Sequence, residues 1–423
     1  MGVRVWLVVL WSAAPAGAID EAGPERAGEA VTVHLPEPQH LRNRGGSDGV
    51  GLCVFASIAH AGLYQNEPLA ASLFEYMTTR PGGGYPEKVT DVFRSAARDK
   101  GEAAPGYVQH TGGDEAFLRL ALRTGRYPCV TYSGADGVFY RSRVAHMVNL
   151  VRLDATWAVI HDNNYPGRYL WMEPAEFLAR WRDMGGGWAV VLLRSPPPPV
   201  PTSDSSPAAE KCDTPLSAVA KADGGPNFGI VEDRIPREVR YEVNGVEWPR
   251  RRVFEAFGSP LSDDRDRLFV TAVGDAAMRD RVKRDFDGEL EEWQSRVHLN
   301  AYAPDHWMVR AIGLRPGVTV QGAARSDGRS VVLTRLRKYE AGDAPALAGA
   351  LRRADPNYRP DLDPEQGAPP AVPAEREWVL LAAAVVGVSF RDWLMSLPSR
   401  LFRRRPKIDA AELEAFRRWK TRA

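Results

Sequence analysis

The chain has 423 residues, 44% of them hydrophobic, which is enough for two or three domains with apolar cores. Its 55 basic and 54 acidic residues leave a formal net charge of +1. Arg-rich stretches alternate with Asp and Glu, so no domain has an overall basic excess. This balance excludes a nucleic-acid-binding protein as the expected class, and no nucleic-acid partner is expected.

The first 18 residues have the pattern of a secretory signal peptide. Arg4 precedes an apolar core over residues 5–11, and Ala16-Gly17-Ala18 suits signal peptidase. The alternative is a buried first helix. Cleavage would start the mature chain near Ile19, so we expect an exported bacterial protein, in the periplasm or at the cell surface.

Cys53 stands where a glycine-rich loop, GGSDGVG, gives way to an apolar run. Apolar residues recur at three and four positions over residues 54–62, which predicts a helix with one buried face. Cys53 would then lie in the first turn, where free backbone N–H groups and the helix dipole favour thiolate over thiol. This position predicts a nucleophile, whereas the alternative is a small buried hydrophobic residue.

Two apolar, β-branched runs, residues 144–153 and 157–162, flank a short polar break and predict a β-hairpin. If the hairpin is centred on Asp154, His146 and Asp162 face each other, with Cβ atoms about 4.5–5.5 Å apart. A carboxylate could then orient the imidazole. The alternative is that His146 is an ordinary strand histidine and Asp162 begins a polar turn.

These residues together resemble the papain-like cysteine peptidase superfamily, and residues 146–181 are most similar to its double-glycine, or bacteriocin-processing, branch. The resemblance covers residues 35–195 and implies an α+β papain-like domain. It implies that Cys53 is the nucleophile, His146 the general base and then acid, and Asp162 the orienting group, with Asn163 as the substitute if the register slips by one. The implied activity is hydrolysis of a peptide or other amide bond in a peptide or protein substrate through an acyl-enzyme, without a cofactor.

The chain departs from this family at the oxyanion hole, where Ser47 replaces the usual glutamine six residues before the cysteine. The Ser47 hydroxyl, the Asn43 amide and the Cys53 backbone N–H are the remaining donors. Losing one such donor typically costs about a hundredfold or more in rate. Two alternatives to a peptidase therefore stay open: an inactive papain-like binding module, and an acyl or amide transferase with the same triad.

A metal site is not expected, although His146, His161, Asp162 and Cys53 contain suitable ligand atoms. His161 and Asp162 are adjacent strand residues and should point to opposite faces of the sheet. The chain has three cysteines in all. We expect Cys129 to be free and buried, and the alternative is a disulfide between Cys129 and Cys212.

Residues 196–227 begin with the proline run PPPPVP and predict an extended linker that does not pack. Residues 228–358 are expected to form an α/β domain that resembles the thioredoxin fold, and the alternative is a generic α/β domain. Pro316 lies before its third strand, where that family has a cis proline. No Cys-x-x-Cys follows the first strand, so a module without redox activity is expected. The expected elements are a strand and turn at 241–245, helices at 251–257, 276–297 and 344–353, a strand at 267–275, an extended stretch at 298–310, and a hairpin of residues 316–320 and 330–336.

After a second linker, residues 359–376, comes a segment over residues 377–397 that contains a mainly apolar run of thirteen residues, 378–390. A membrane span needs about 20, so the segment reaches that length only by including Arg391 and Asp392. The basic tail, residues 398–423, would lie in the cytoplasm by the positive-inside tendency. We therefore expect a transmembrane or interfacial anchor, with the membrane as a partner. The alternative is a buried helix of a soluble domain.

Overall fold

The computed structural model describes residues 19–183, 185–202, 239–254, 261, 263–325 and 328–355. The expected signal peptide, the second linker, the anchor, the basic tail and Cys212 lie outside these residues. No helix in the described ranges is long and apolar enough to cross a membrane. The described residues belong to one compact unit with a mixed α/β fold and several sheets.

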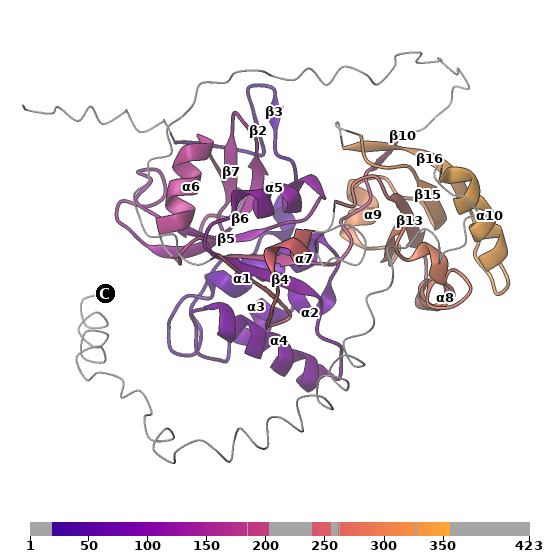
Figure 1. The fold of residues 1–423 in the computed structure, drawn as a ribbon, viewed down its shortest axis with the longest axis horizontal. Coiled ribbons are helices and arrows are strands. Elements are labelled where there is room, and N and C mark those ends of the chain that lie inside the picture. The colour runs from indigo at the N-terminus through magenta and orange to yellow at the C-terminus, as the bar shows by residue number, and fades with distance from the viewer. Residues whose placement is uncertain are drawn as a thin grey trace, which may run out of the picture. The chain divides into compact units, whose positions relative to one another are not determined.

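Nine strands form the largest sheet, in the order β1-β8-β7-β6-β5-β9-β4-β11-β12, and every neighbouring pair is antiparallel (Figure 1). A separate hairpin pairs β2 (Glu25–Arg26) with β3 (Glu29–Ala30). The nine strands are β1 (Asp20–Ala22), β4 (Tyr107–Thr111), β5 (Cys129–Ser133), β6 (Ala145–Leu153), β7 (Ala158–His161), β8 (Tyr169–Met172), β9 (Ala189–Leu192), β11 (Arg240–Val243) and β12 (Val246–Glu247).

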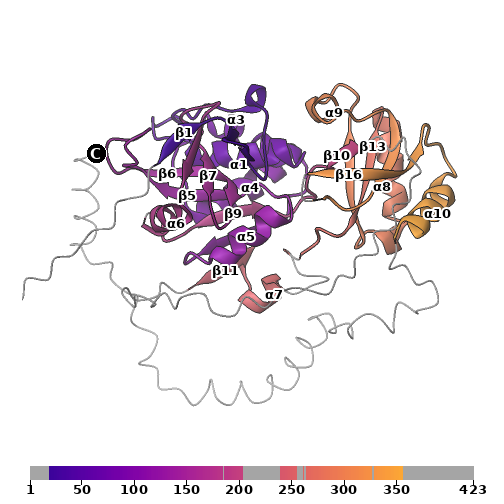
Figure 2. The same cartoon turned by 90° about the horizontal axis from the view of Figure 1, so that it is seen from above.

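Helix α1 (Cys53–Tyr64) contacts β6 of this sheet as well as α2 (Pro68–Ala71) and α3 (Leu73–Met77). All residues from 54 to 62 are buried. The prediction of a single buried face is therefore too limited, because α1 is buried on all sides over these residues. It lies between the sheet and other helices, and it is apolar all round. Figures 1 and 2 show α5 (Glu115–Arg123) and α6 (Pro174–Asp183) on the opposite side of the sheet from α1.

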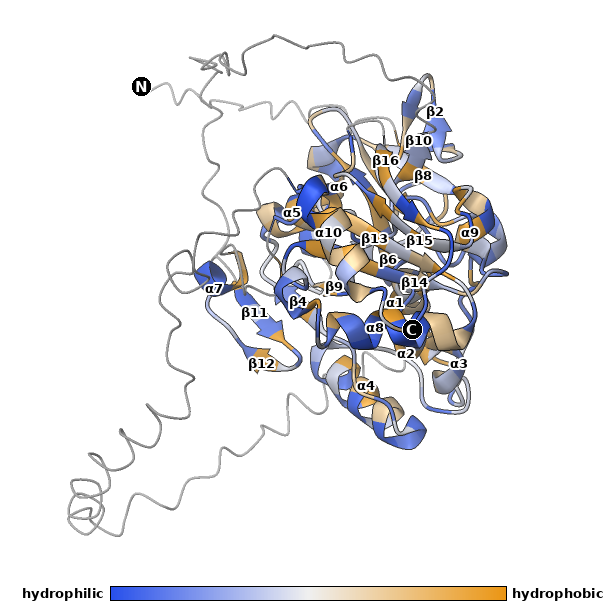
Figure 3. Cartoon of the chain, turned by 90° about the vertical axis from the view of Figure 1, so that its right-hand side faces the viewer, coloured by the Kyte–Doolittle hydropathy of each residue, from blue (hydrophilic) through white to orange (hydrophobic). Residues whose placement is uncertain are grey.

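Helix α4 (Pro86–Lys100) lies at the surface and carries both hydrophobic and hydrophilic colours in Figure 3. Its apolar stripe, including Val89 and Phe93, is buried, as expected for an amphipathic helix packed on a core. The helix ends at Gly101, whose φ of 65° is left-handed and suits glycine. The chain then turns into β4.

The expected hairpin of β6 and β7 is present, but its register differs from the prediction. Asn149 pairs with His161, and a bulge after Leu150 shifts the later pairs to Arg152 with Val159. The prediction that His146 and Asp162 face each other directly is therefore wrong. The bulge adds one residue to β6, and Asp162 lies just beyond the end of β7.

Five strands form the second sheet, in the order β10-β16-β15-β13-β14. Strand β13 is parallel to β14 and antiparallel to β15, β15 is antiparallel to β16, and β10 is parallel to β16. The elements are β10 (Val200–Thr202), β13 (Leu268–Val273), α8 (Ala276–Phe286), a 3-10 helix η2 (Glu291–Trp293), β14 (Val297–Tyr302), α9 (Trp307–Ala311), β15 (Gly317–Gln321), β16 (Arg329–Leu336) and α10 (Ala344–Ala354).

Two expectations for this region need correction. The helix expected over residues 276–297 is too long, because α8 ends at Phe286 and the Asp287-Gly288 turn follows it. The stretch expected to be extended after it contains β14 and then the short helix α9. Pro316 does precede the third strand, β15, and its peptide bond is trans, since the described residues contain no cis peptide bond.

The proline run is extended, but it packs, so the expectation of an unpacked linker is wrong for residues 196–202. Its first residue, Pro196, is buried, and its carbonyl accepts a hydrogen bond from Asn300 at 3.2 Å. Pro199 is also buried, and its carbonyl accepts one from Gln321 at 2.9 Å. The run leads into β10, which joins the second sheet.

The chain then returns to the first sheet. Strand β11 pairs with β4, β12 pairs with β11, and α7 (Arg250–Phe254) packs on β11. The strand and turn expected at residues 241–245 are present, with left-handed φ angles at Asn244 and Gly245. They belong, however, to the nine-stranded sheet rather than to the expected module of residues 228–358.

Candidate active site

Cys53 is the first residue of α1, as predicted, and its side chain is partly exposed. The preceding N–H, of Leu52, donates to the Asn43 side-chain oxygen at 2.9 Å and to the Arg44 carbonyl at 2.9 Å. These bonds fix the point at which the glycine-rich loop enters the helix. Backbone N–H groups of the first turn have no acceptor within the helix, so they are free to face the sulfur or a ligand.

A second glycine-rich loop, residues 81–84, packs against the first. The Gly83 N–H donates to the Gly51 carbonyl at 2.8 Å, and the Gly82 N–H donates to the Asp48 carboxylate at 2.8 Å. A Cβ atom on Gly82 would lie 1.8 Å from the Val50 carbonyl oxygen. The two loops can therefore approach this closely only because Gly82 has no side chain.

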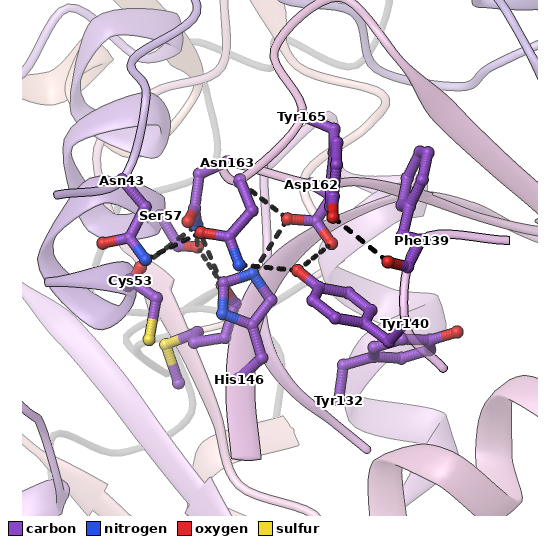
Figure 4. A network of polar contacts seen from close by, with 12 residues as sticks. Asn43, Cys53, Ser57, Tyr132, Phe139, Tyr140, His146, Asp162, Asn163 and Tyr165 are labelled. Atoms are coloured by element: carbon purple, nitrogen blue, oxygen red, sulfur yellow. Dashed lines mark hydrogen bonds and ion pairs between the residues drawn. The ribbon is translucent and has the colours of Figure 1, made fainter. Parts of the chain in front are cut away.

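His146, the second residue of β6, lies between Cys53 and Asp162 in Figure 4. Its Nε2 lies 2.8 Å from Asp162 Oδ1, and this pair is fully buried. Since Nε2 faces the carboxylate, Nδ1 is the ring nitrogen left to face Cys53, whose thiol interacts with His146. The predicted contact is therefore present even though the predicted strand register is not, because Asp162 reaches diagonally from the end of β7.

The electrostatics of this group favour a thiolate–imidazolium pair. Burial by itself would raise the pKa of the Cys53 thiol, but the hydrogen bond and charge of His146, with the Met147 and Val54 N–H groups, lower it below its usual value. Burial would likewise lower the pKa of His146, but the Asp162 carboxylate and then Cys53 raise it to about 10. Each partner thus stabilises the charged form of the other.

Asn163, the predicted substitute for Asp162, does not touch the imidazole. Its amide nitrogen donates to the Cys53 carbonyl at 3.2 Å, to the Ser57 hydroxyl at 2.9 Å and to the Met147 carbonyl at 2.9 Å. Ser57 also donates to the Met147 carbonyl, at 3.0 Å. Asn163 therefore ties the start of α1 to β6, while Asp162 is the residue placed to orient His146.

The two predicted oxyanion donors are placed differently. Asn43 accepts the Leu52 N–H, one residue before the nucleophile, and its amide nitrogen donates to Asn164 Oδ1 at 2.8 Å. That nitrogen keeps a second hydrogen atom. Ser47 lies on the exposed part of the loop, where its N–H donates to the Arg80 carbonyl at 2.9 Å. Of the two side chains, Asn43 is the one that the structure brings to the start of α1.

Two residues that the sequence analysis did not single out complete the polar network in Figure 4. The Tyr140 hydroxyl donates to Asp162 Oδ2 at 2.9 Å, and the Asn164 side chain donates to the Tyr140 oxygen at 2.6 Å. The Asn164 backbone N–H donates to Asp162 Oδ1 at 2.8 Å. Sequence could have suggested Asn164, which continues the run Asp162-Asn163-Asn164, but no local pattern marks Tyr140.

His161 points away from Asp162, as expected for neighbouring strand residues. Its ring packs against those of His40 and His60 in tilted arrangements, with centroids 3.9 and 4.7 Å away, and its Nδ1 lies 3.0 Å from the Tyr127 hydroxyl. Within the described part of the chain, no group of three or more His, Cys, Asp or Glu side chains has the geometry to hold a metal ion. The His161 ring is thus part of the core and not of the Cys53 site.

Cys129 on β5 is free and buried, which was the expected state. Burial raises the pKa of its thiol well above the usual value. Cys129 and Cys53 are therefore opposite in character, although both are free thiols. Comparison with models of known protein families finds no match to this chain, and comparison with curated proteins finds no significant match.

Proposed function

We propose that the protein is a thiol hydrolase of the papain-like kind, and most specifically a cysteine peptidase. The observation that carries the proposal is the chain of contacts from Cys53 at the start of α1 through His146 to the buried Asp162. A lowered thiol pKa provides the nucleophile, and an imidazole held by a carboxylate provides the proton donor. Cys53 as a residue is partly exposed, which supports access for a substrate.

The chemistry follows from these positions. The Cys53 thiolate attacks the substrate carbonyl carbon, and the developing oxyanion is stabilised by the Cys53 N–H and the Asn43 amide. His146, protonated at the start, gives its proton to the leaving amine as the acyl-enzyme forms. His146 then takes a proton from water, which attacks the thioester and releases the acid and the Cys53 thiolate.

The second sheet is proposed to be a thioredoxin-like module that acts as a spacer or docking surface. The succession β13-α8-β14-α9-β15-β16-α10 supports this proposal. Thiol exchange requires a thiolate, and the chain has no cysteine after Cys212. Export and tethering to a membrane by residues 377–397 remain proposals that rest on the sequence.

The test is the pH dependence of Cys53 alkylation by iodoacetamide in the full-length protein, read by mass spectrometry of the Cys53 peptide. Rapid alkylation should persist well below pH 8.5, the usual thiol pKa, while Cys129 stays unlabelled. His146→Ala should move the midpoint above the usual value, because burial, the largest influence on the thiol, is then opposed only by the Met147 and Val54 N–H groups. His34→Ala, which changes an exposed histidine, is the matched control and should leave the profile unchanged.

Substrate turnover separates the proposed activity from its alternatives. A peptide library incubated with the protein should yield hydrolysed products, and Cys53→Ser should abolish them without unfolding the protein. Hydrolysis should fall near pH 10 as His146 loses its proton. Products joined to an added amine would favour the transferase. Labelling of Cys53 no faster than that of an unfolded cysteine peptide at pH 6 would instead favour the inactive binding module.

A further inference from the structure

The loop between β5 and β6, residues 134–144, places one side chain directly on the catalytic carboxylate. Its Tyr140 hydroxyl is 2.9 Å from Asp162 Oδ2 (Figure 4). The other carboxylate oxygen, Oδ1, already receives His146 Nε2 and the Asn164 N–H. Asp162 is completely buried, so Tyr140 supplies a hydrogen bond that water does not replace.

The direction of each hydrogen bond in this network follows from a single backbone group. Leu52 can only donate through its N–H, so the Asn43 side-chain atom that faces it is the oxygen. The Asn43 nitrogen must then donate to the Asn164 oxygen, and the Asn164 nitrogen to the Tyr140 oxygen. The Tyr140 oxygen accepts this bond, so its single hydrogen is directed to Asp162. If the Asn43 amide turned round, its bond with the Leu52 N–H would break. If Asn164 or Tyr140 turned round, its bond to the neighbouring side chain would break.

The loop that carries Tyr140 is itself firmly held. Asp136 Oδ1 accepts the N–H groups of Val138, Phe139 and Tyr140 at 2.8, 2.8 and 3.1 Å. The Tyr165 hydroxyl donates to the Phe139 carbonyl at 3.1 Å, and the two rings stack with centroids 4.3 Å apart. The loop is thus built to present the Tyr140 hydroxyl at one position.

We propose that Tyr140 is a positioning residue of the Cys53 site, which holds Asp162 against His146 and, through Asn164, holds the Asn43 amide beside Cys53. This inference rests on the proposed function. Without the hydroxyl, Asp162 Oδ2 has no donor, the carboxylate can rotate, and the imidazolium loses part of its stabilisation. The thiolate of Cys53, which depends on that imidazolium, becomes harder to form.

The experiment is the alkylation profile of Cys53 in Tyr140→Phe, which needs no knowledge of the substrate. The midpoint should move upward by about half to one pH unit, so that the rate at pH 6 falls about three- to tenfold. Tyr339→Phe is the matched control, because it removes a tyrosine hydroxyl that donates to a different carboxylate, Asp285 Oδ2, at 2.7 Å. Its profile should match that of the unaltered protein.

A double-substitution cycle tests whether Tyr140 acts through Asp162. Adding Tyr140→Phe to Asp162→Asn should change the profile by much less than it does alone, because the partner carboxylate is already gone. If Tyr140→Phe does not fold, as judged by thermal unfolding, Asn164→Ala provides the second test. Asn164→Ala leaves the phenol in place but removes its donor, and it should shift the midpoint in the same direction.

The outcomes are distinct from those of the proposed function. A low midpoint in the unaltered protein with no shift in Tyr140→Phe, or with an equal shift in Tyr339→Phe, would overturn the role of Tyr140 and leave the thiol hydrolase in place. Full additivity in the cycle would also overturn it. A normal thiol midpoint in the unaltered protein would remove the proposed function itself, and the role of Tyr140 with it.

Discussion

Asp162 and Asn163 are consecutive in the chain, yet their side chains serve different elements of the site. The Asp162 carboxylate meets His146, and the Asn163 amide binds the Cys53 carbonyl and the Met147 carbonyl. One residue therefore acts on the charge of the imidazole, and the next joins α1 to the sheet. This division of roles gives the two substitutions different expected effects.

Asp162→Asn should lower the reactivity of Cys53 at pH 6 by about tenfold, because the amide still accepts from His146 but no longer stabilises its charge. Asn163→Ala should instead lower the free energy of unfolding by about 1–3 kcal/mol, through lost buried hydrogen bonds, with the alkylation midpoint little changed. Urea unfolding and the alkylation profile, measured on both variants, separate the effects. Equal shifts of the midpoint in the two variants would contradict this assignment.

Gly82→Ala should slow the alkylation of Cys53 and any hydrolysis by about tenfold to a hundredfold, because the added methyl group displaces the loop that enters α1. Rates are measured under identical conditions for Gly322→Ala, whose Cβ would meet only the end of the Leu333 side chain at 4.0 Å. The control should keep the full rate. A fully reactive Gly82→Ala protein would mean that the close approach of the two loops is unimportant for the site.

Arg126→Met should lower the free energy of unfolding by about 3–5 kcal/mol, because it leaves the buried Asp264 carboxylate without its charged partner. The guanidinium binds both carboxylate oxygens, at 3.1 and 2.8 Å, and both side chains are at most 5% exposed. The same exchange at Arg123, whose pair with Asp263 is exposed, should cost about 0–1 kcal/mol. The measurement is urea unfolding at pH 7. A similar loss of unfolding free energy in both variants would show that the Arg126–Asp264 pair is unimportant.

The packed cluster of His40, His60 and His161 should make the stability of the fold sensitive to acid. Burial and the neighbouring His60, His40 and His34 lower the pKa of His161 well below its usual value. Below pH 6.5 His161 is protonated in the unfolded chain but stays neutral in the folded protein, so the free energy of unfolding falls as the pH falls. A histidine that stays neutral at pH 5 costs about 2 kcal/mol relative to pH 8.

His161→Phe keeps an aromatic ring at this position and removes the imidazole that titrates. Its unfolding free energy should therefore decline less than that of the unaltered protein between pH 8 and pH 5. His34→Phe, at an exposed histidine, is the comparison and should change the slope much less. An unchanged slope in His161→Phe would show that His161 takes up its proton normally in the folded state.

Much of the candidate site could be predicted because its signals are local. A glycine-rich loop followed by an apolar run marks the helix start at Cys53, and two apolar strands with a polar break place His146 and Asp162 close together. The prediction centres the hairpin on Asp154, whereas the strands turn between Leu153 and Ala158, and no local pattern marks that longer turn, so the register was predicted wrongly. Tyr140 was missed because its role depends on a loop whose path is set by Asp136 and Tyr165, and not by periodicity.

The fold shows the same limit at longer range. Most strands and helices of residues 241–353 follow from their patterns, apart from α8, which ends early at Asp287-Gly288, and α9, which lies in a stretch expected to be extended. What the local pattern does not contain is the choice of partner strand. Strand β10 ends a proline run that predicts a linker, and β11 lies in the stretch expected to join the second module, but β10 pairs with β16 and β11 with β4.

This exchange of strands decides where the chain can be divided. A fragment that ends within the proline run would leave β4 without β11, and it would expose a row of unpaired backbone groups at the edge of the nine-stranded sheet. A fragment that begins after β11 would lack β10 and leave β16 open in the same way. Each fragment would have an exposed edge strand that can pair with other chains, whereas in the intact protein β11 and β10 cover these edges. Aggregation of such pieces would then reflect the missing strand and not an intrinsic instability of either sheet.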